Sequence, residues 1–150
     1  MTKYKLTKRK ENDADYCKRI PTALLDELGK KINKVVFKQK RYREKGFTAR
    51  QLAQELNTNS RYVSATLCIK FRQNFKELVN RCRVAEAMSI LTDVRYDDYR
   101  MEDVAETVGF SSRQTFYAGF YKVNGISPKE YKKQYFARLQ AEKQMEKEEK

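Results

Sequence analysis

Two clusters of polar side chains in this chain have the types and spacing needed to form hydrogen bonds with the edges of DNA bases. The first cluster is Asn59, Arg61 and Ser64, and the second is Arg113, Gln114 and Tyr117. Arginine can donate two parallel hydrogen bonds to guanine, and the amide of glutamine can pair in the same way with adenine. The two clusters therefore predict contacts with base edges.

Residues able to hold a phosphate lie beside both clusters. A helix N-terminus presents free N–H groups to an anion, and Ser or Thr hydroxyls there can contact the same phosphate. The sequence predicts phosphate contacts from Thr58, Ser60, Ser111, Ser112 and Lys122. The hydroxyl residues are expected first of all to cap helices, and a purely solvated role for the charged residues remains open.

The composition favours a polyanionic partner and disfavours catalysis. The 150 residues carry a net charge of +13, concentrated towards the N-terminal end, and include no histidine. Without histidine the chain lacks the commonest general base and the commonest metal ligand. We therefore expect no enzyme activity, no cofactor and no metal site. The charge alone does not separate DNA from RNA, a membrane surface or mere solubility, and double-stranded DNA is expected as the partner because of the two clusters of base-contacting side chains.

The cysteines and the lengths of the apolar runs indicate the cellular compartment of the protein. Cys17, Cys68 and Cys82 show no close pairing of the metal-binding kind, and Cys68 and Cys82 fall among apolar neighbours. These two are expected to be buried structural thiols. An odd number of thiols, no evident signal peptide and only short apolar runs predict a cytoplasmic protein with no membrane contact.

Apolar periodicity and capping signals predict a chain of helices. Thr22 is expected to cap a long first helix, the pair Thr48 and Gln51 to cap the second, and Ser60 to open the third. A further pair, Ser111 and Gln114, is expected to cap the helix that carries the second cluster. The expected helical ranges are 22–43, about 49–56, 60–71, 74–91, 102–108, 112–123 and from 128 towards the end of the chain.

An internal repeat organises these helices. Leu52 and Ala53 match Val104 and Ala105 at an offset of 52, while Val63 and Leu67 match Phe116 and Phe120 at an offset of 53. The extra residue is assigned to the turn, where Gly109 has no counterpart. Each copy has a short helix, a tight turn and a second helix, which is the pattern of a helix-turn-helix unit that inserts its second helix in the major groove.

The predicted fold is all-α, with two homeodomain-like three-helix subdomains joined by a long central helix. We expect a flexible basic arm at 1–20, a first subdomain at 21–91 that includes the linker helix, a second subdomain at 92–136 and a charged helical tail at 137–150. A central helix of about 18 residues is about 27 Å long. It could hold helices 60–71 and 112–123 in adjacent major-groove segments of one duplex, about 34 Å apart. A monomer or a weak dimer formed through the first helix would suffice.

Residues from about 48 to 134 resemble the DNA-binding domain of the AraC/XylS family. The resemblance rests on the run Val104-Ala105-Glu106-Thr107-Val108-Gly109-Phe110-Ser111, on Phe116, Phe120, Lys122 and Gly125, and on Ser127-Pro128-Lys129-Glu130-Tyr131. In the first copy Tyr62-Val63-Ser64, Phe75 and Arg83-Val84-Ala85-Glu86-Ala87 also fit. The resemblance implies a bacterial regulator that acts at promoters, commonly as an activator in contact with RNA polymerase.

Three residues depart from the family pattern. Ala65 and Ala118 stand where arginine is usual, and Arg72 stands where glycine is usual. The family's ligand-binding barrel does not fit in residues 1–47, so no small-molecule effector domain is expected. These departures motivate an alternative function, a helical protein-interaction module on the same fold that has lost specific DNA binding.

Several other residues are assigned structural roles. Val63, Leu67, Phe116 and Phe120 are expected in the core, and Arg83 is expected to make ion pairs or hydrogen bonds between the two units. The ten tyrosines could also stack on single-stranded RNA, but they are scattered through helices, which favours packing.

Overall fold

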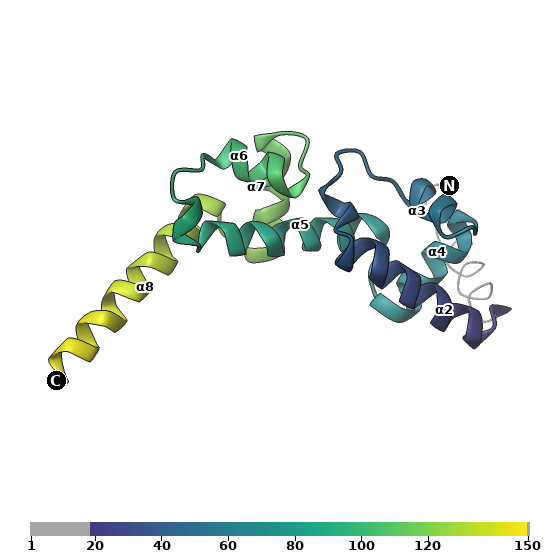
Figure 1. Ribbon diagram of the computed structural model, residues 1–150, viewed down its shortest axis with the longest axis horizontal. Coiled ribbons are helices and arrows are strands. Elements are labelled where there is room, and N and C mark those ends of the chain that lie inside the picture. Colours follow the sequence, from purple (N-terminus) through teal and green to yellow (C-terminus); the bar gives the residue numbers. More distant parts are fainter. Residues whose placement is uncertain (1–18, 150) are drawn as a thin grey trace, which may run out of the picture. The chain divides into compact units, whose positions relative to one another are not determined.

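The computed structural model describes residues 19–149, and every regular element in this range is a helix (Figure 1). Contacts divide the chain into two compact units. Unit 1 comprises residues up to Arg41 and Phe47–Val79, and unit 2 comprises Tyr42–Gly46 and the residues from Asn80 onward. The all-α prediction is confirmed. The predicted basic arm at 1–20 lies almost wholly outside the described residues, as does Cys17.

Unit 1 is built from three helical stretches. The first is α2 (Thr22–Ile32), continued by a π-helical turn, η1 (Asn33–Lys38), and the second is α3 (Ala49–Glu55). The third is α4 (Ser60–Thr66), which also continues as a π-helical turn, η3 (Leu67–Phe71). Ile32, Leu52, Val63 and Leu67 are fully buried, so one apolar face of each stretch contributes to a common core.

The first helix differs from the prediction at both ends. Thr22 is the first helical residue and caps nothing, because Pro21 holds the N-cap position with no side-chain hydrogen bond. The α-helix ends at Ile32 rather than near Arg43. After η1, Lys40 adopts a left-handed backbone with φ of 54°, and only a short 3-10 turn, η2 (Arg41–Arg43), follows. A left-handed residue cannot continue a right-handed helix, so the chain turns there.

Arg72 ends the third stretch in the conformation that glycine prefers. Its φ of 54° and ψ of 32° lie in the left-handed region, and the chain then enters α5 (Phe75–Leu91). Asn74 caps α5, since its side-chain oxygen accepts a hydrogen bond from the N–H of Glu77 at 2.8 Å. The turn before the central helix therefore depends on a left-handed backbone conformation at Arg72, which costs about 1 kcal/mol for a residue other than glycine.

Unit 2 contains most of α5 together with α6 (Met101–Val108), α7 (Arg113–Asn124) and α8 (Pro128–Glu148). A 3-10 turn, η4 (Val94–Tyr96), lies between α5 and α6. Phe116 and Phe120 are fully buried against Val84, Val104 and Val108, as predicted for the two phenylalanines. Beyond Leu139, α8 leaves this core and its side chains are exposed, which Figure 1 shows as the projecting yellow helix.

The long central helix predicted at 74–91 is confirmed as α5, and its residues are divided between the two units. Phe75–Val79 belong to unit 1, where the rings of Phe75 and Phe47 lie 5.4 Å apart, and the rest of α5 belongs to unit 2. The division into subdomains at 21–91 and 92–136 stays a prediction.

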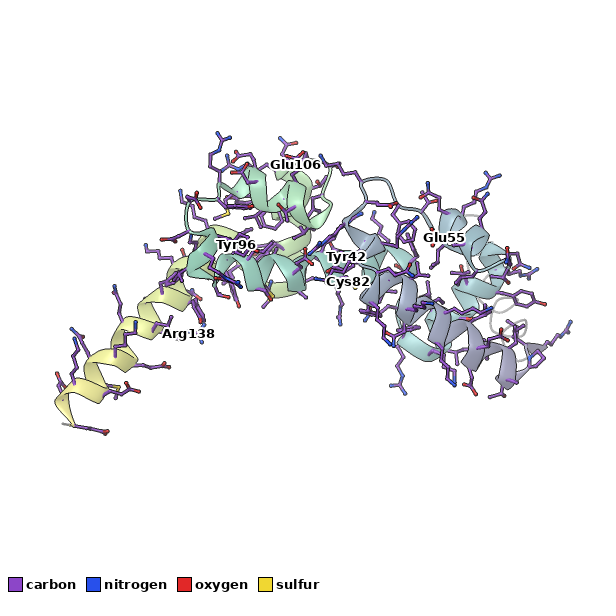
Figure 2. The ribbon with its side chains drawn as sticks, in the orientation of Figure 1. Tyr42, Glu55, Cys82, Tyr96, Glu106 and Arg138 are labelled. Atoms are coloured by element: carbon purple, nitrogen blue, oxygen red, sulfur yellow. The ribbon has the colours of Figure 1, made fainter. Side chains whose placement is uncertain are left out.

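The five residues Tyr42–Gly46 pack with unit 2 through polar contacts on α5. Arg83 donates hydrogen bonds to the carbonyl oxygens of Tyr42 at 2.7 Å and Glu44 at 3.0 Å. Glu86 accepts from the Tyr42 hydroxyl at 2.5 Å and pairs with Arg43 at 2.8 Å. In Figure 2 Tyr42 lies beside Cys82 of α5. Arg83 therefore has the structural role expected of it, but within one unit and not between the two.

Candidate nucleic-acid interface

The N-terminus of α7 is closed by a capping box one residue later than predicted. The Ser112 hydroxyl accepts from the N–H of Thr115 at 3.1 Å, and the Thr115 hydroxyl accepts from the N–H of Ser112 at 3.1 Å. The predicted pair of Ser111 and Gln114 is wrong, because Ser111 still lies in the turn. This shift leaves the Gln114 side chain without a capping role, exposed on the first turn of the helix.

The two sides of α7 differ sharply. Phe116 and Phe120 are fully buried, and Gly119 lies so close to α5 that the Asn80 amide donates to its carbonyl oxygen at 3.3 Å. A Cβ at Gly119 would lie 2.3 Å from the Asn80 side-chain oxygen and 3.0 Å from the Phe110 ring, so a larger residue here would have to displace these side chains. The opposite side carries Gln114 and Lys122, both exposed. That side is free to enter a groove.

Arg113 lies at the flank of this exposed side rather than at its centre. Its guanidinium pairs with Glu102 of α6 at 3.2 Å and lies 5.1 Å from the centre of the Tyr117 ring. The hydrogen bond with the Tyr117 hydroxyl and the nearby Glu102 carboxylate raise the pKa of Arg113. The charge is thus partly balanced by Glu102, and both side chains remain about half exposed.

In unit 1 helix α4 begins at Ser60 as predicted, but its cap lies one residue earlier than expected. Asn59, not Ser60, caps α4, and its side-chain oxygen accepts from the N–H of Tyr62 at 2.8 Å. Arg61 and Ser64 are exposed, whereas Thr58 is partly buried in the turn. Capping uses one of the two acceptor positions of the Asn59 oxygen, and its amide N–H groups remain as donors to a base.

The turns of the two copies correspond more closely than the sequence comparison suggested. Asn57 has φ of 53° and Gly109 has φ of 106°, and each begins the turn after the short helix. The next N–H donates to an alanine carbonyl in both copies, Thr58 to Ala53 and Phe110 to Ala105. Gly109 therefore does have a counterpart, Asn57, and the extra residue lies between Gly109 and the cap at Ser112.

Two exposed residues on the third helices were not among the predicted contacts. Tyr121 is 62 % exposed, and it follows Gln114 by seven residues on the same side of α7. Its match at the offset of 53 is Cys68, which is also exposed and follows Arg61 by seven residues. The helical spacing alone could have identified both. The prediction that Cys68 is a buried structural thiol is wrong.

Cys82 differs from Cys68 and offers a chemical test of the fold. Burial raises the pKa of the Cys82 thiol from 9.0 to about 11. Because the thiolate is the reactive form, we expect Cys82 in the native protein at pH 8 to react with iodoacetamide about 100-fold more slowly than in urea. The native rate should rise about tenfold per pH unit up to pH 10. Peptide mass spectrometry measures each rate, and equal native and denatured rates would contradict the partly buried position of Cys82.

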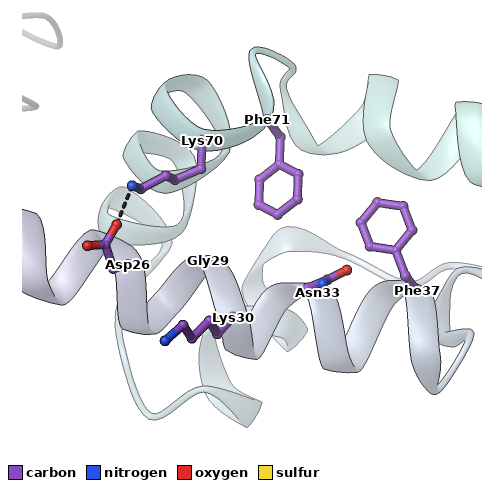
Figure 3. Close-up of a pocket in the computed structure, with 7 residues that line it drawn as sticks. All are labelled: Asp26, Gly29, Lys30, Asn33, Phe37, Lys70 and Phe71. Atoms are coloured by element: carbon purple, nitrogen blue, oxygen red, sulfur yellow. Dashed lines mark hydrogen bonds and ion pairs between the residues drawn. The ribbon is translucent and has the colours of Figure 1, made fainter.

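Unit 1 also has an open groove of about 580 Å³ between α2 and η3 (Figure 3). The rings of Phe37 and Phe71 face each other there with centres 6.1 Å apart, and Lys70 pairs with Asp26. No residue predicted to contact DNA lines this groove. Its other polar lining residues are Lys30 and Asn33.

The paired short helix, tight turn and exposed third helix define a helix-turn-helix protein. The chain belongs to the helix-turn-helix domain family of the AraC type, since the family described as "Helix-turn-helix domain" matches residues 52–134, more than half of the sequence. This confirms the resemblance seen in the sequence. The family binds DNA and is not an enzyme family.

Individual relatives agree with this assignment. The chain is 27% identical over 90 residues to the melibiose operon regulatory protein of Escherichia coli, covering 60% of this chain and 29% of that protein. It is 30% identical over 91 residues to the uncharacterized HTH-type transcriptional regulator YtdP of Bacillus subtilis, covering 61% and 11%. The chain thus spans less than a third of the length of these curated relatives.

Solved structures share the fold. The C-terminal domain of AraT, a response regulator from Geobacillus stearothermophilus, has a TM-score of 0.62 and 22% identity over 77% of this chain and 88% of that one. The C-terminal domain of the response regulator yesN from Fusobacterium nucleatum has a TM-score of 0.61 and 26% identity over 67% and 93%. Among residues 19–149 no helix is both long and apolar enough to cross a bilayer.

Proposed function

We propose that this chain is the DNA-binding part of a transcription regulator and recognises double-stranded DNA in a sequence-dependent manner. In this proposal α4 with η3 and α7 occupy two adjacent major-groove segments. The observation that carries it is the two-sided character of α7, whose phenylalanines are buried while Gln114, Ala118, Tyr121 and Lys122 are exposed. A net charge of +13 supports attraction to phosphates.

Each contact predicted from the sequence has a role in the proposal. Base edges are read by Asn59, Arg61 and Ser64 from α4 and by Arg113, Gln114 and Tyr117 from α7. Phosphates are held near the helix starts by Thr58, Ser60, Ser111 and Ser112, and in the last turn of α7 by Lys122. The exposed starts of both helices support these roles, since capped N-termini also present N–H groups to an anion.

A comparison of Gln114→Ala with Lys122→Ala tests this function. Duplexes bound by the full chain are first selected from a random pool to define a site. Gln114→Ala should lower affinity for that site about tenfold, with no change on random duplex, because a bidentate base contact discriminates by about 1–3 kcal/mol. Lys122→Ala, the matched control, should weaken both duplexes alike and reduce the salt slope by about 1.

The outcomes separate the proposal from its alternative. Equal losses on selected and random duplex for Gln114→Ala would remove its role in base reading. No duplex binding at all near micromolar concentrations would favour the protein-interaction module, because non-specific contact with DNA normally reaches that range. Contact with RNA polymerase and a monomeric or weakly dimeric state belong to the same proposal and are tested by copurification and by sedimentation.

A further inference from the structure

The outward side of α7 has a small apolar residue at its centre. Gln114, Ala118 and Tyr121 are spaced i, i+4 and i+7, so they lie in one row along the helix, and all three are exposed. The row lies opposite Phe116 and Phe120, and Gly119 packs on Asn80 on the inner side. Ala118 is therefore the residue that α7 offers at the middle of the surface proposed to enter the groove.

The matching residue of α4, Ala65, is buried. Ala65 lies at the offset of 53 from Ala118, yet only 4 % of it is exposed. It packs in one cluster with Ile20 and Leu25, at the start of the first helix, and Leu24 and Tyr62 border this cluster. A Cβ covered in this way cannot reach a base. The same residue type thus has two different environments in the two copies.

The chemistry of an exposed alanine limits what it can recognise. Its methyl group has no donor or acceptor, so it can distinguish bases only by apolar contact, and in the major groove only thymine presents a methyl group. Its small size also lets the helix backbone approach the base pairs closely. One turn earlier, Gln114 carries an amide that can pair with adenine. Two neighbouring residues of α7 thus suit A·T pairs.

We propose that Ala118 contacts a thymine methyl group and, with Gln114, makes α7 specific for A·T pairs, while Ala65 serves only packing in unit 1. This inference rests on the proposed function. Tyr121 completes the row, where its hydroxyl donates to a phosphate oxygen at the groove edge. Residues 114 and 118 are about 6 Å apart along the helix, so the methyl contact falls within about two base pairs of the Gln114 contact.

Replacement of thymine by deoxyuridine tests the methyl contact without changing base pairing. Single thymines of the selected site are replaced in turn, and affinities for the full chain are measured by fluorescence polarisation at one salt concentration. We expect about a fourfold loss at one thymine near the base pair whose preference Gln114→Ala relaxes, which is the value of about one buried methyl group. This loss should vanish in Ala118→Gly.

The ratio of affinities for thymine and deoxyuridine is internal to each variant, so a general loss of stability does not alter it. Ala118→Ser provides a second variant that replaces the methyl group with a polar group, and its ratio should also fall to about one. Ala137→Gly, at an exposed position of α8, and Ala65→Gly, at the buried match, should both keep the fourfold ratio.

Each result has a defined meaning. A fourfold ratio retained in both Ala118 variants overturns the methyl contact, and so does the absence of any sensitive thymine near the Gln114 contact. Loss of the ratio in Ala65→Gly overturns the division between the two units. Sequence-specific binding with no thymine effect removes this inference alone, whereas failure of the unmodified chain to bind any duplex removes the proposed function as well.

Discussion

Replacement of Gly109 by alanine should destabilise unit 2 by about 3 kcal/mol or more, and should reduce DNA binding in proportion to the unfolded fraction. Gly109 ends α6 with φ of 106°, which side chains rarely tolerate. A Cβ there would lie 2.5 Å from the Tyr42 carbonyl oxygen and 2.7 Å from the Arg43 carbonyl carbon. These are backbone atoms, so the substitution adds a clash that no rotamer change can relieve.

Gly125→Ala is the matched control for this prediction. Gly125 also has a positive φ, 73°, and ends α7 in the same way, but nothing lies within 4 Å of a Cβ placed there. We expect it to lose only about 1 kcal/mol, the cost of the left-handed backbone. Urea denaturation followed by circular dichroism measures both variants. Similar midpoints for the two would show that the contact of Gly109 with residues 42–43 is not the source of strain.

Arg83→Met should destabilise unit 2 by about 2–3 kcal/mol. The change keeps the apolar stem but removes the donors to the Tyr42 and Glu44 carbonyl oxygens, which Arg83 holds at 2.7 and 3.0 Å. Hydrogen bonds from a charged donor contribute about 1.5–3 kcal/mol. The guanidinium also lies 5.7 Å from the centre of the Phe110 ring, and this cation–π contact is lost as well.

Arg81→Met, two residues earlier on α5, provides the comparison. Arg81 is exposed, so its replacement should change the free energy of unfolding by less than about 0.5 kcal/mol. Amide hydrogen exchange of residues 42–46 in the folded protein locates the effect, because these amides should exchange faster in Arg83→Met alone. Unchanged exchange there, despite a lower stability, would place the role of Arg83 elsewhere in the unit.

Capping signals in the sequence predicted the helix starts correctly at two places. Thr48 with Gln51 forms the predicted capping box, and Ser127 with Pro128 begins α8 as expected. At Ser60 and Ser111 the predicted cap is one residue off. Neighbouring Asn and Ser residues have nearly equal capping ability, and the exact length of the turn decides which of them takes the extended conformation.

Other features depend on contacts that a sequence does not mark. Nothing in the sequence signals the left-handed Lys40, which lies with no glycine or proline beside it, so the end of the first helix was placed too late. Ala65 and Ala118 look equivalent in the repeat, and the packing of Ile20 and Leu25 in one cluster with Ala65 separates them. Cys68 differs from these cases, because its spacing from Arg61 indicated the exposed side although its apolar neighbours suggested burial.

The assignment of Tyr42–Gly46 to unit 2 has a consequence for how this protein can be rearranged. The chain leaves unit 1 at Arg41, contributes five residues to unit 2, and returns to unit 1 at Phe47. Neither unit is therefore one continuous stretch of sequence. If two such proteins exchanged helix-turn-helix units at a single crossover between Phe47 and Val79, Arg83 and the two carbonyl groups that it binds would come from different parents. Recombination between two such proteins should therefore succeed only when both segments of unit 2, Tyr42–Gly46 and the residues from Asn80 onward, come from the same parent protein.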